Sequence, residues 1–212
     1  MADILQEMAS SLYGGEQEEV ARMVQGALDQ GMSAAEILSN GLIAGMDQVG
    51  RDFKAGDLFV PEVLVAARAM SVGMDVLRPL LATGDVSSAG KCVIGTVKGD
   101  LHDIGKNLVK MMLEGAGFET VDLGTDVGPV DFVEAVRKHQ PNIVGLSALL
   151  TTTMVNMKTT IEALEEAGLR EGLKIMVGGA PVTGAFAEKT GADAYAPDAA
   201  TAVDVARDLQ EA

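Results

Sequence analysis

The chain has 212 residues, 48% of them hydrophobic, and a formal net charge of −15. That length suffices for one large domain or two small ones, and the acidic balance argues against a nucleic-acid or anionic-membrane partner, since either needs a basic face. The N-terminus has no basic segment followed by an apolar one, and no apolar run is long enough for a membrane span. The single Cys92 permits no internal disulfide. We therefore expect a cytoplasmic protein that binds neither nucleic acid nor membrane.

The first 82 residues have the periodicity of amphipathic helices, with apolar residues at helical spacing over 4–12 and 20–28. Ser33-Ala-Ala-Glu36 resembles a capping box at the start of a third helix. Pro61 suits the first turn of a fourth. The expected apolar faces of these two helices are Leu38, Leu42, Met46, Val49 and Phe53, and then Leu64, Ala67, Met70, Met74 and Leu77. The pattern predicts a four-helix bundle.

Residues 82–90 have the composition of a linker, and we expect them to join a helical domain, 1–88, to a second domain, 89–212. Beyond the linker the hydrophobic pattern changes to one typical of alternating strands and helices. Short apolar runs lie at 92–97, 120–123, 143–146 and 175–177, with a weaker one at 194–196. This alternation predicts an α/β domain with a flavodoxin-like, five-stranded parallel sheet, in which ligands bind at the carboxyl ends of the strands.

Polar or glycine-rich segments follow three of these strands. Gly99–Gly105 follows the first, Ser147-Ala148-Leu149 the third, and Gly178-Gly179 the fourth. In the usual strand order of this fold the first and third strands are neighbours. The three segments are therefore expected to converge on one cleft.

The segment GTVKGDLHDIGKNLV, residues 95–109, holds one of the two histidines between two acids. An N-capping acid and a phosphate-cradling turn are two simple interpretations, although the dinucleotide-binding and P-loop spacings are absent. A phospho-accepting receiver domain needs an aspartate after the third strand, where Ser147 stands. A further interpretation is a metal ligand, because a carboxylate commonly fixes the second N–H of a ligating imidazole. One histidine can supply an axial ligand to a metal held by a macrocycle, and the low aromatic content, 3%, favours a cobalt corrin over haem.

The motifs also carry a resemblance. Asp100-Leu-His102-Asp-Ile-Gly105, Ser147-Ala-Leu149 and Gly178-Gly179 match, in order and spacing, the D-x-H-x-x-G, S-x-L and G-G motifs of cobamide-binding modules. The chain resembles the corrinoid proteins of methanol, methylamine and O-demethylase methyltransferase systems, and the cobalamin module of methionine synthase. Residues 50–61, GRDFKAGDLFVP, look like the end of the helical cap over the corrin in those proteins. The resemblance therefore spans nearly the whole chain.

The resemblance implies roles for individual residues. His102 is expected to be the lower axial ligand of cobalt in a base-off cobamide, Asp100 to hydrogen-bond its other nitrogen, and Thr153 to complete the relay where methionine synthase has a serine. The nucleotide tail and lower face of the cofactor would contact Gly99, Leu101, Asp103, Ile104, Gly105, Ser147, Leu149, Thr151, Gly178, Gly179 and Ala199. Phe53 and Val60 would cover the upper face. Lys98 and Lys106 flank the motif, either as cofactor contacts or as solvated charges.

The resemblance further implies a methyl carrier whose cobalt cycles between Co(I) and methyl-Co(III). It would accept the methyl group from a substrate-specific methyltransferase, pass it to a second methyltransferase, be restored by a reductive activase, and have no activity alone. A cobalamin-binding sensor and the small subunit of an adenosylcobalamin mutase are the alternatives. The acidic composition without a DNA-binding segment counts against the first, and the four-helix cap against the second. The methyl donor stays open among methylamines, methanol, betaines and aryl methyl ethers.

Overall fold

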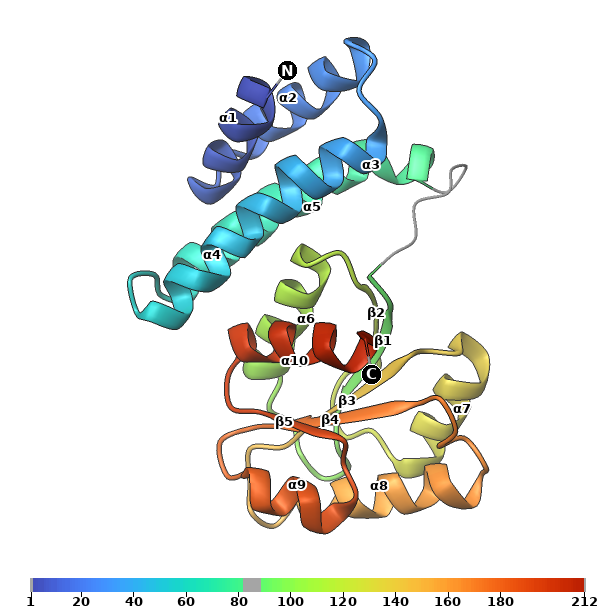
Figure 1. Ribbon diagram of the computed structural model, residues 1–212. Coiled ribbons are helices and arrows are strands. Elements are labelled where there is room, and N and C mark those ends of the chain that lie inside the picture. The colour runs from blue at the N-terminus through green and yellow to red at the C-terminus, as the bar shows by residue number, and fades with distance from the viewer. Residues whose placement is uncertain (1, 82–88, 212) are drawn as a thin grey trace. The chain divides into compact units, whose positions relative to one another are not determined.

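The protein is described by a computed structural model over residues 2–81 and 89–211 (Figure 1). Its contacts divide it into two compact units, a helical one and an α/β one. The predicted linker, 82–90, falls mostly outside the described residues. None of the described helices is both long and apolar enough to cross a membrane.

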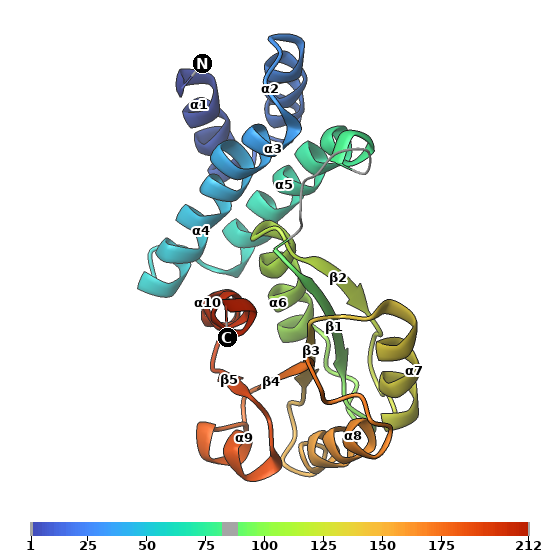
Figure 2. The same ribbon diagram turned by 45° about the vertical axis from the view of Figure 1, so that its right-hand side comes forward.

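The helical unit contains the four predicted helical segments (Figure 2). They are α1 (Ala2–Tyr13), α2 (Gln17–Asp29), a run made of α3 (Ala34–Ile37), the π-helical η1 (Leu38–Ile43) and α4 (Ala44–Ala55), and α5 (Val60–Leu81). The Ser33 hydroxyl accepts a hydrogen bond from Glu36 N at 3.2 Å, as the predicted helix start requires. The π-helical stretch was not predicted, because its extra residue per turn leaves no composition signal.

Two glycines allow the third segment to approach α1 closely. A methyl group added at Gly41 would lie 2.7 Å from Met8 Sδ, and one at Gly45 would lie 3.1 Å from the Ala9 carbonyl oxygen. The predicted apolar residues Leu38, Leu42, Met46 and Val49 are buried around this contact, while Phe53 is only partly buried. Gly41 and Gly45 were not predicted to lie at this contact, because a search for the periodicity of large apolar residues does not register glycines.

Helix α5 buries a wider stripe than its predicted face. Ala67, Met70 and Leu77 are buried as expected, but Leu64 and Met74 are partly exposed and Val63 and Ala66 are buried in addition. The reason is that α5 packs against both α2 and α4, so two neighbouring helices cover adjacent parts of its surface.

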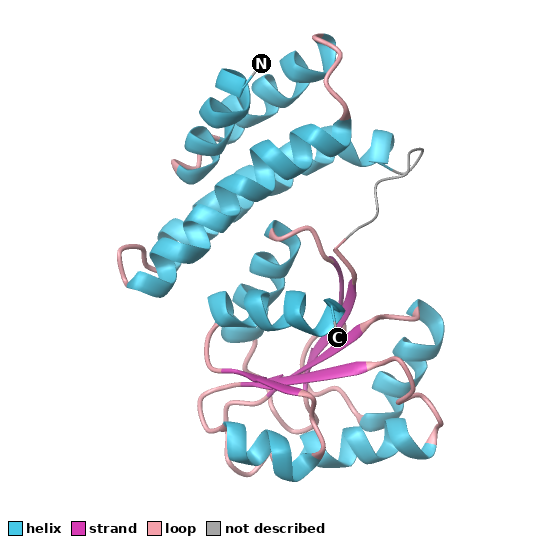
Figure 3. Ribbon diagram, viewed as in Figure 1, coloured by secondary structure: helices cyan, strands magenta, loops and turns pink. Residues whose placement is uncertain are grey.

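The α/β unit is a five-stranded parallel sheet in the order β2-β1-β3-β4-β5 (Figure 3). The strands are β1 (Lys91–Thr96), β2 (Glu119–Asp122), β3 (Ile143–Ser147), β4 (Lys174–Gly178) and β5 (Ala194–Ala196). The helices are α6 (Ile104–Gly115), α7 (Pro129–His139), α8 (Val155–Glu166), α9 (Gly184–Thr190) and α10 (Ala199–Glu211). Helices α6 and α10 cover one face of the sheet and α7, α8 and α9 the other (Figures 1 and 2). This is the predicted flavodoxin-like arrangement, with β1 beside β3.

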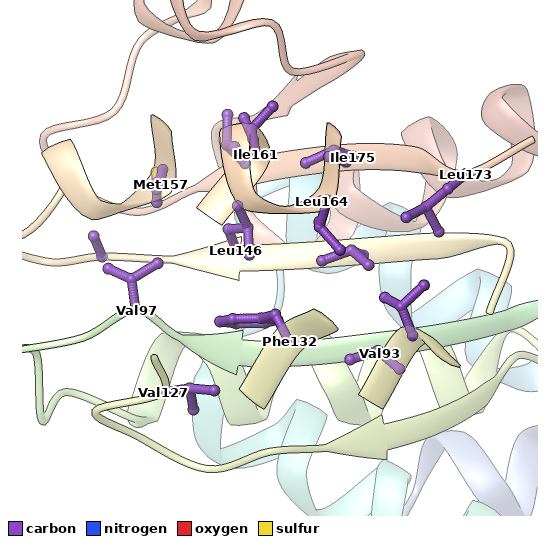
Figure 4. Packing of buried hydrophobic residues seen from close by; sticks show 14 of the residues in the cluster. Val93, Val97, Val127, Phe132, Leu146, Met157, Ile161, Leu164, Leu173 and Ile175 are labelled. Atoms are coloured by element: carbon purple, nitrogen blue, oxygen red, sulfur yellow. The ribbon is translucent and has the colours of Figure 1, made fainter. Parts of the chain in front are cut away.

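The core under α7 and α8 explains the continuous apolar runs of the strands, because both faces of this sheet are covered. Val93, Leu146 and Ile175 pack against Phe132, Leu164 and other helical residues (Figure 4). Gly95 makes room for Phe132, whose ring would lie 2.8 Å from a methyl group added there. On β1, Cys92 is fully buried, and burial raises the pKa of its thiol to about 12. Cys92 is therefore a core residue, as its strand position indicates.

Candidate functional site

The carboxyl ends of four strands form one row across the sheet. Thr96 lies beside Ser147, Ser147 beside Gly178, and Gly178 beside Ala196 in the parallel registers. The loops that leave these residues therefore start side by side. They carry the segments that the sequence predicts to converge, and the first of them carries His102.

The His102 ring is oriented by a buried carboxylate. Its Nδ1 lies 2.8 Å from Asp100 Oδ1, and the His102 main-chain N–H donates to the same oxygen at 3.1 Å. The side chain of Asp100 is 0% exposed, whereas that of His102 is 51% exposed. With a carboxylate as its acceptor, Nδ1 carries the proton, and Nε2 is the ring nitrogen that remains for an external ligand.

The second oxygen of Asp100 is bound by the segment that follows β3. Asp100 Oδ2 accepts from the Thr153 hydroxyl at 2.6 Å, from Leu149 N at 2.8 Å and from Leu150 N at 3.3 Å. Burial raises the pKa of this carboxyl, but the hydrogen bonds from Thr153, Leu149 and His102 outweigh it and hold the pKa well below its usual range. Asp100 is thus a stable buried carboxylate, with one oxygen directed at the imidazole and the other at Thr153.

Two polar side chains hold the backbone of the His102 loop, and neither was predicted. The buried Thr96 donates its hydroxyl proton to the His102 carbonyl oxygen at 2.9 Å. Asn156 Nδ2, in the first turn of α8, donates to the Lys98 carbonyl oxygen at 2.7 Å. Thr96 could have been suspected as a polar residue ending a buried strand. Asn156 lies 58 positions from its partner and gave no local signal.

Exposed apolar side chains lie in the same loops of this edge as the exposed imidazole. Leu101 and Ile104 flank His102 in the sequence and are 73% and 79% exposed, and Leu149, Leu150 and Val155 are exposed as well. Exposed apolar groups gathered beside a single polar group are typical of a surface that binds a large, mostly apolar ligand.

Three of the four predicted glycines differ in what surrounds them. A methyl group added at Gly105 would meet no atom within 4 Å, so this glycine borders open space. One at Gly178 would lie 3.0 Å from the Ala196 carbonyl oxygen, and one at Gly179 only 1.9 Å from that of Ala148. Gly179 also has φ +129°, a conformation that favours glycine. At Gly105 no packing contact requires a glycine, so access for a ligand is the reason we give for it. At Gly179 the close approach of the Ala148 backbone already requires a glycine.

The remaining predicted residues lie in several environments. Ser147 is half-buried at the end of β3, Thr151 is exposed, and Ala199 is buried at the start of α10. Asp103 precedes α6, and its carboxylate accepts from Asn107 Nδ2 at 3.2 Å. Gly99 has φ +83° in the turn before Asp100. Phe53 and Val60 belong to the helical unit, at the end of α4 and the start of α5.

Lys106 is neither a solvated charge nor a free contact for a phosphate. Its side chain is 1% exposed, and its Nζ donates to Asp122 Oδ1 at 2.6 Å and to Asn107 Oδ1 at 2.7 Å. Burial raises the pKa of Asp122, but the hydrogen bonds from Lys106 and from Gly124 N, together with the positive charges of Lys106 and Lys110, outweigh it and lower that pKa overall. Lys106 therefore ties α6 to the end of β2.

Comparison with known protein families decides what kind of site this is. Residues 90–204 and residues 4–78 each match a family described as a B12 binding domain. The chain belongs to the B12-binding corrinoid proteins. The two matches cover both units of this corrinoid protein, the α/β unit with residues 90–204 and the helical unit with residues 4–78.

Full-length relatives agree with this assignment. The corrinoid protein is 46% identical to dimethylamine corrinoid protein 1 of Methanosarcina mazei, over 98% of this chain and 96% of the relative. It is 44% identical to trimethylamine corrinoid protein 1 of Methanosarcina acetivorans, over 97% and 96%. Among solved structures, the methanol:cobalamin methyltransferase complex MtaBC of Methanosarcina barkeri contains a chain matched with a TM-score of 0.88 and 30% identity, over 99% of this chain and 80% of that one.

Proposed function

We propose that this corrinoid protein is the methyl carrier of a methyltransferase system and that His102 is the protein ligand of its cobalt. The observation that carries the proposal is the His102–Asp100 pair, which leaves Nε2 exposed within an apolar surface. The full-length relatives support a carrier over a sensor, because they are named for methylamines as substrates.

The residues at the carboxyl edge suit a cobamide. Among the residues that the structure describes, no group of three or more His, Cys, Asp or Glu side chains could hold a metal ion, so the cobalt would depend on its macrocycle together with the single imidazole of His102. Leu101, Ile104 and Leu149 offer an apolar surface to the lower face of the ring. When bound, a cobamide supplies a cobalt that can take up a methyl group and give it away.

The nucleotide tail, displaced by His102 in the base-off state, needs a path along the same edge. We assign it to the space beside Gly105, then past Ser147, Leu149 and Thr151, to Gly178-Gly179 and Ala199. The open surroundings of Gly105 and the alignment of Ser147 with Gly178 support this path. Gly99, Leu101, Asp103 and Ile104 form the loop from which His102 projects.

The His102–Asp100–Thr153 relay would control a proton during methyl transfer. Methyl-Co(III) would accept an axial imidazole whereas Co(I) would not, so His102 would bind and release the metal in each cycle. Asp100 holds the proton on Nδ1, and the Thr153 hydroxyl keeps the other carboxylate oxygen satisfied. A threonine therefore supplies the hydroxyl that the relay requires, and its extra methyl group does not prevent the bond.

The helical unit would act as a cap, with Phe53 and Val60 over the methyl side of the ring and the domain boundary at residue 88. Partners would supply both half-reactions: a methyltransferase specific for a methylamine, a second methyltransferase that receives the methyl group, and a reductive activase. The dimethylamine and trimethylamine relatives favour a methylamine as donor over methanol.

Electron paramagnetic resonance of the Co(II) holoprotein tests the ligand. In the wild type, nitrogen superhyperfine splitting from a protein imidazole is expected, and in His102→Ala it should vanish. His139→Ala is the matched control, because this second histidine lies in the last turn of α7 and not at the carboxyl edge. Splitting that persists in His102→Ala would exclude His102 as the ligand.

Stopped-flow spectroscopy tests the carrier function. The reduced holoprotein should take up methyl groups from dimethylamine or trimethylamine only when the corresponding methyltransferase is added. Rapid methylation by the holoprotein alone would show that the protein is an enzyme in its own right and would overturn the carrier proposal.

A further inference from the structure

The turn that carries Asp100 is held from the side of β2 by one residue, Asp126. The Gly99 N–H donates to Asp126 Oδ1 at 2.7 Å, and the Asp126 N–H donates to the Asp100 carbonyl oxygen at 2.9 Å. One residue thus supplies both an acceptor and a donor to the two-residue segment Gly99-Asp100. Nothing in the motif of that segment points to a partner 27 positions away.

Asp126 adopts an uncommon backbone conformation to make these two bonds. It has φ +55°, and in the described part of the chain the only other non-glycine residue with positive φ is Gln140. Gln140 ends α7, where a left-handed residue is common. Asp126 ends no helix, and strained non-glycine residues outside helix ends cluster at functional sites. Aspartate tolerates this conformation better than most residues, which suits it to the position.

The segment around Asp126 is itself anchored to the end of β1. Thr96 N donates to the Gly124 carbonyl oxygen at 3.0 Å, and Val127 N donates to the Thr96 carbonyl oxygen at 2.9 Å. Val97 and Val127 form an isolated parallel bridge and both belong to the buried core (Figure 4). The backbone at Asp126 is therefore fixed to the end of β1 independently of the turn that its carboxylate binds.

The Asp100 turn is thus held from two sides. Asn156 and Thr153 hold it from the start of α8, and Asp126 from the segment after β2. Support from one side alone leaves the turn free to pivot about the remaining contacts. A pivot at Gly99-Asp100 would move the Asp100 carboxylate, and with it the His102 ring that this carboxylate orients.

We propose that Asp126 is a positioning residue, which fixes the Gly99-Asp100 turn so that His102 Nε2 is held where it would ligate the cobalt of a bound cobamide. The inference rests on the proposed role of His102 as the cobalt ligand. The new claim is that ligation by His102 also depends on the Asp126 carboxylate. This carboxylate binds the Gly99 N–H, not His102 and not the groups that the Asp100 side chain binds.

Two substitutions separate the side-chain bond from the backbone conformation. Asp126→Gly removes the acceptor but keeps the main-chain N–H and accepts a positive φ without strain. Asp126→Asn keeps an oxygen acceptor in the same place and also tolerates this φ. Thr125→Ala, in the neighbouring residue, is the control for a general disturbance of the loop.

The first readout uses the protein without cofactor. Amide hydrogen exchange followed by NMR should show the Gly99 N–H exchanging about tenfold faster in Asp126→Gly, the factor expected when one hydrogen bond to a charged acceptor is lost. Asp126→Asn should restore most of the protection, and Thr125→Ala should match the wild type. Equal Gly99 exchange in the wild type and Asp126→Gly would overturn the proposal.

The second readout is the Co(II) paramagnetic resonance spectrum of the loaded protein. The fraction with imidazole nitrogen splitting should fall in Asp126→Gly and recover in Asp126→Asn, at an unchanged midpoint of thermal unfolding. If the wild type shows no such splitting, the proposed ligand is wrong; if the wild type shows it and Asp126→Gly equals it, only the present inference is wrong. If the fraction with nitrogen splitting falls as far in Asp126→Asn as in Asp126→Gly, the present inference is also wrong, because Asp126→Asn keeps the oxygen that accepts from Gly99 N.

A measurement on the wild type decides the case in which Asp126→Gly does not fold. The hydrogen bond between Gly99 N–H and the Asp126 carboxylate should give a scalar coupling across it between Gly99 ¹⁵N and Asp126 ¹³Cγ. Couplings across the backbone hydrogen bonds of the same sheet serve as the internal reference. Their detection without the Gly99–Asp126 coupling would overturn the proposal.

Discussion

The two units of this corrinoid protein rely on different kinds of interaction. In the helical unit most close contacts of the glycines are with apolar side chains, such as Gly41 against Met8 and Gly73 against Leu42, although Gly45 also approaches the Ala9 carbonyl oxygen. At the carboxyl edge of the α/β unit they are hydrogen bonds that side-chain carboxylates accept from backbone N–H groups far away in the chain, as at Asp100 and Asp126. A flexible thioether can move aside, whereas a backbone group held in a sheet cannot. The helical unit should therefore tolerate small changes that the edge does not.

The largest expected effect contrasts one glycine from each region. Gly179→Ala should lower the free energy of unfolding by about 4 kcal/mol, because it combines an unfavourable φ with a clash against the Ala148 backbone. Gly41→Ala should cost less than about 1 kcal/mol, since Met8 can shift and alanine favours a helix. Urea unfolding followed by NMR signals of each unit measures both. Similar costs for the two variants would refute the contrast.

A core deletion tests whether apolar burial carries the helical unit. Leu42 is fully buried, and Leu42→Ala should lower the free energy of unfolding of this unit by about 3 kcal/mol. Val65→Ala on α5 is the control, because Val65 is 40% exposed and loses little burial on truncation. The same urea titration measures both, and a Leu42→Ala midpoint as high as that of the control would show that the interior of this unit is loosely packed.

The buried Lys106 provides a matching test of a polar interaction in the α/β unit. Asp122→Asn leaves the Lys106 ammonium buried opposite a neutral partner and should cost about 2 kcal/mol, reduced because the Asp122 side chain is 24% exposed. Asp204→Asn in α10 is a control that removes a carboxylate charge from the same unit.

The pH dependence of this difference has a defined sign. The pKa of Asp122 is lowered in the folded protein, so its contribution is complete above the unfolded value of about 3.9 and disappears as the pH falls through the folded value. The wild type and Asp122→Asn should therefore differ constantly above about pH 5 and converge in stronger acid. A gap that persists at the acid end would show that the charge of Asp122 is not responsible.

The smallest effects come from matched helix caps, one in each unit. The Ser33 hydroxyl accepts from Glu36 N and the Thr183 hydroxyl from Phe186 N, both at 3.2 Å. Ser33→Ala and Thr183→Ala should each cost about 1 kcal/mol. Because local bonds of this kind do not depend on the surrounding region, equal costs are expected, and a clear inequality would mean that the two regions differ even in local interactions.

Local patterns were enough to predict the strands and the helical segments of the first unit. The apolar runs identified the five strands and helical periodicity identified the four helical segments, while the resemblance of the D-x-H motif implied the contact between Asp100 and His102. Each of these properties is determined by residues a few positions apart.

What was missed depends on partners that the chain brings together only in space. Lys106 was expected either to contact the cofactor or to lie in solvent, and its actual partner Asp122 is 16 positions away. Asp126, in a loop, and Asn156, in a helix, have no local sequence feature that indicates a role. Only the folded sheet brings them beside the Asp100 turn. The π-helical stretch of 38–43 was missed because its extra residue per turn leaves no composition signal.

The donors to Asp100 from Leu149 and Leu150 are main-chain N–H groups, and this has an evolutionary consequence. Any residue except proline can make such a bond, so both positions can drift without loss of the partner of His102. Their exposed side chains are then free to adapt to different cobamides or methyltransferases while the relay is inherited unchanged. A library randomised at these two positions should keep the Asp100 carboxylate hydrogen-bonded in most members and vary mainly in the binding of the cofactor that we propose to lie against Leu149.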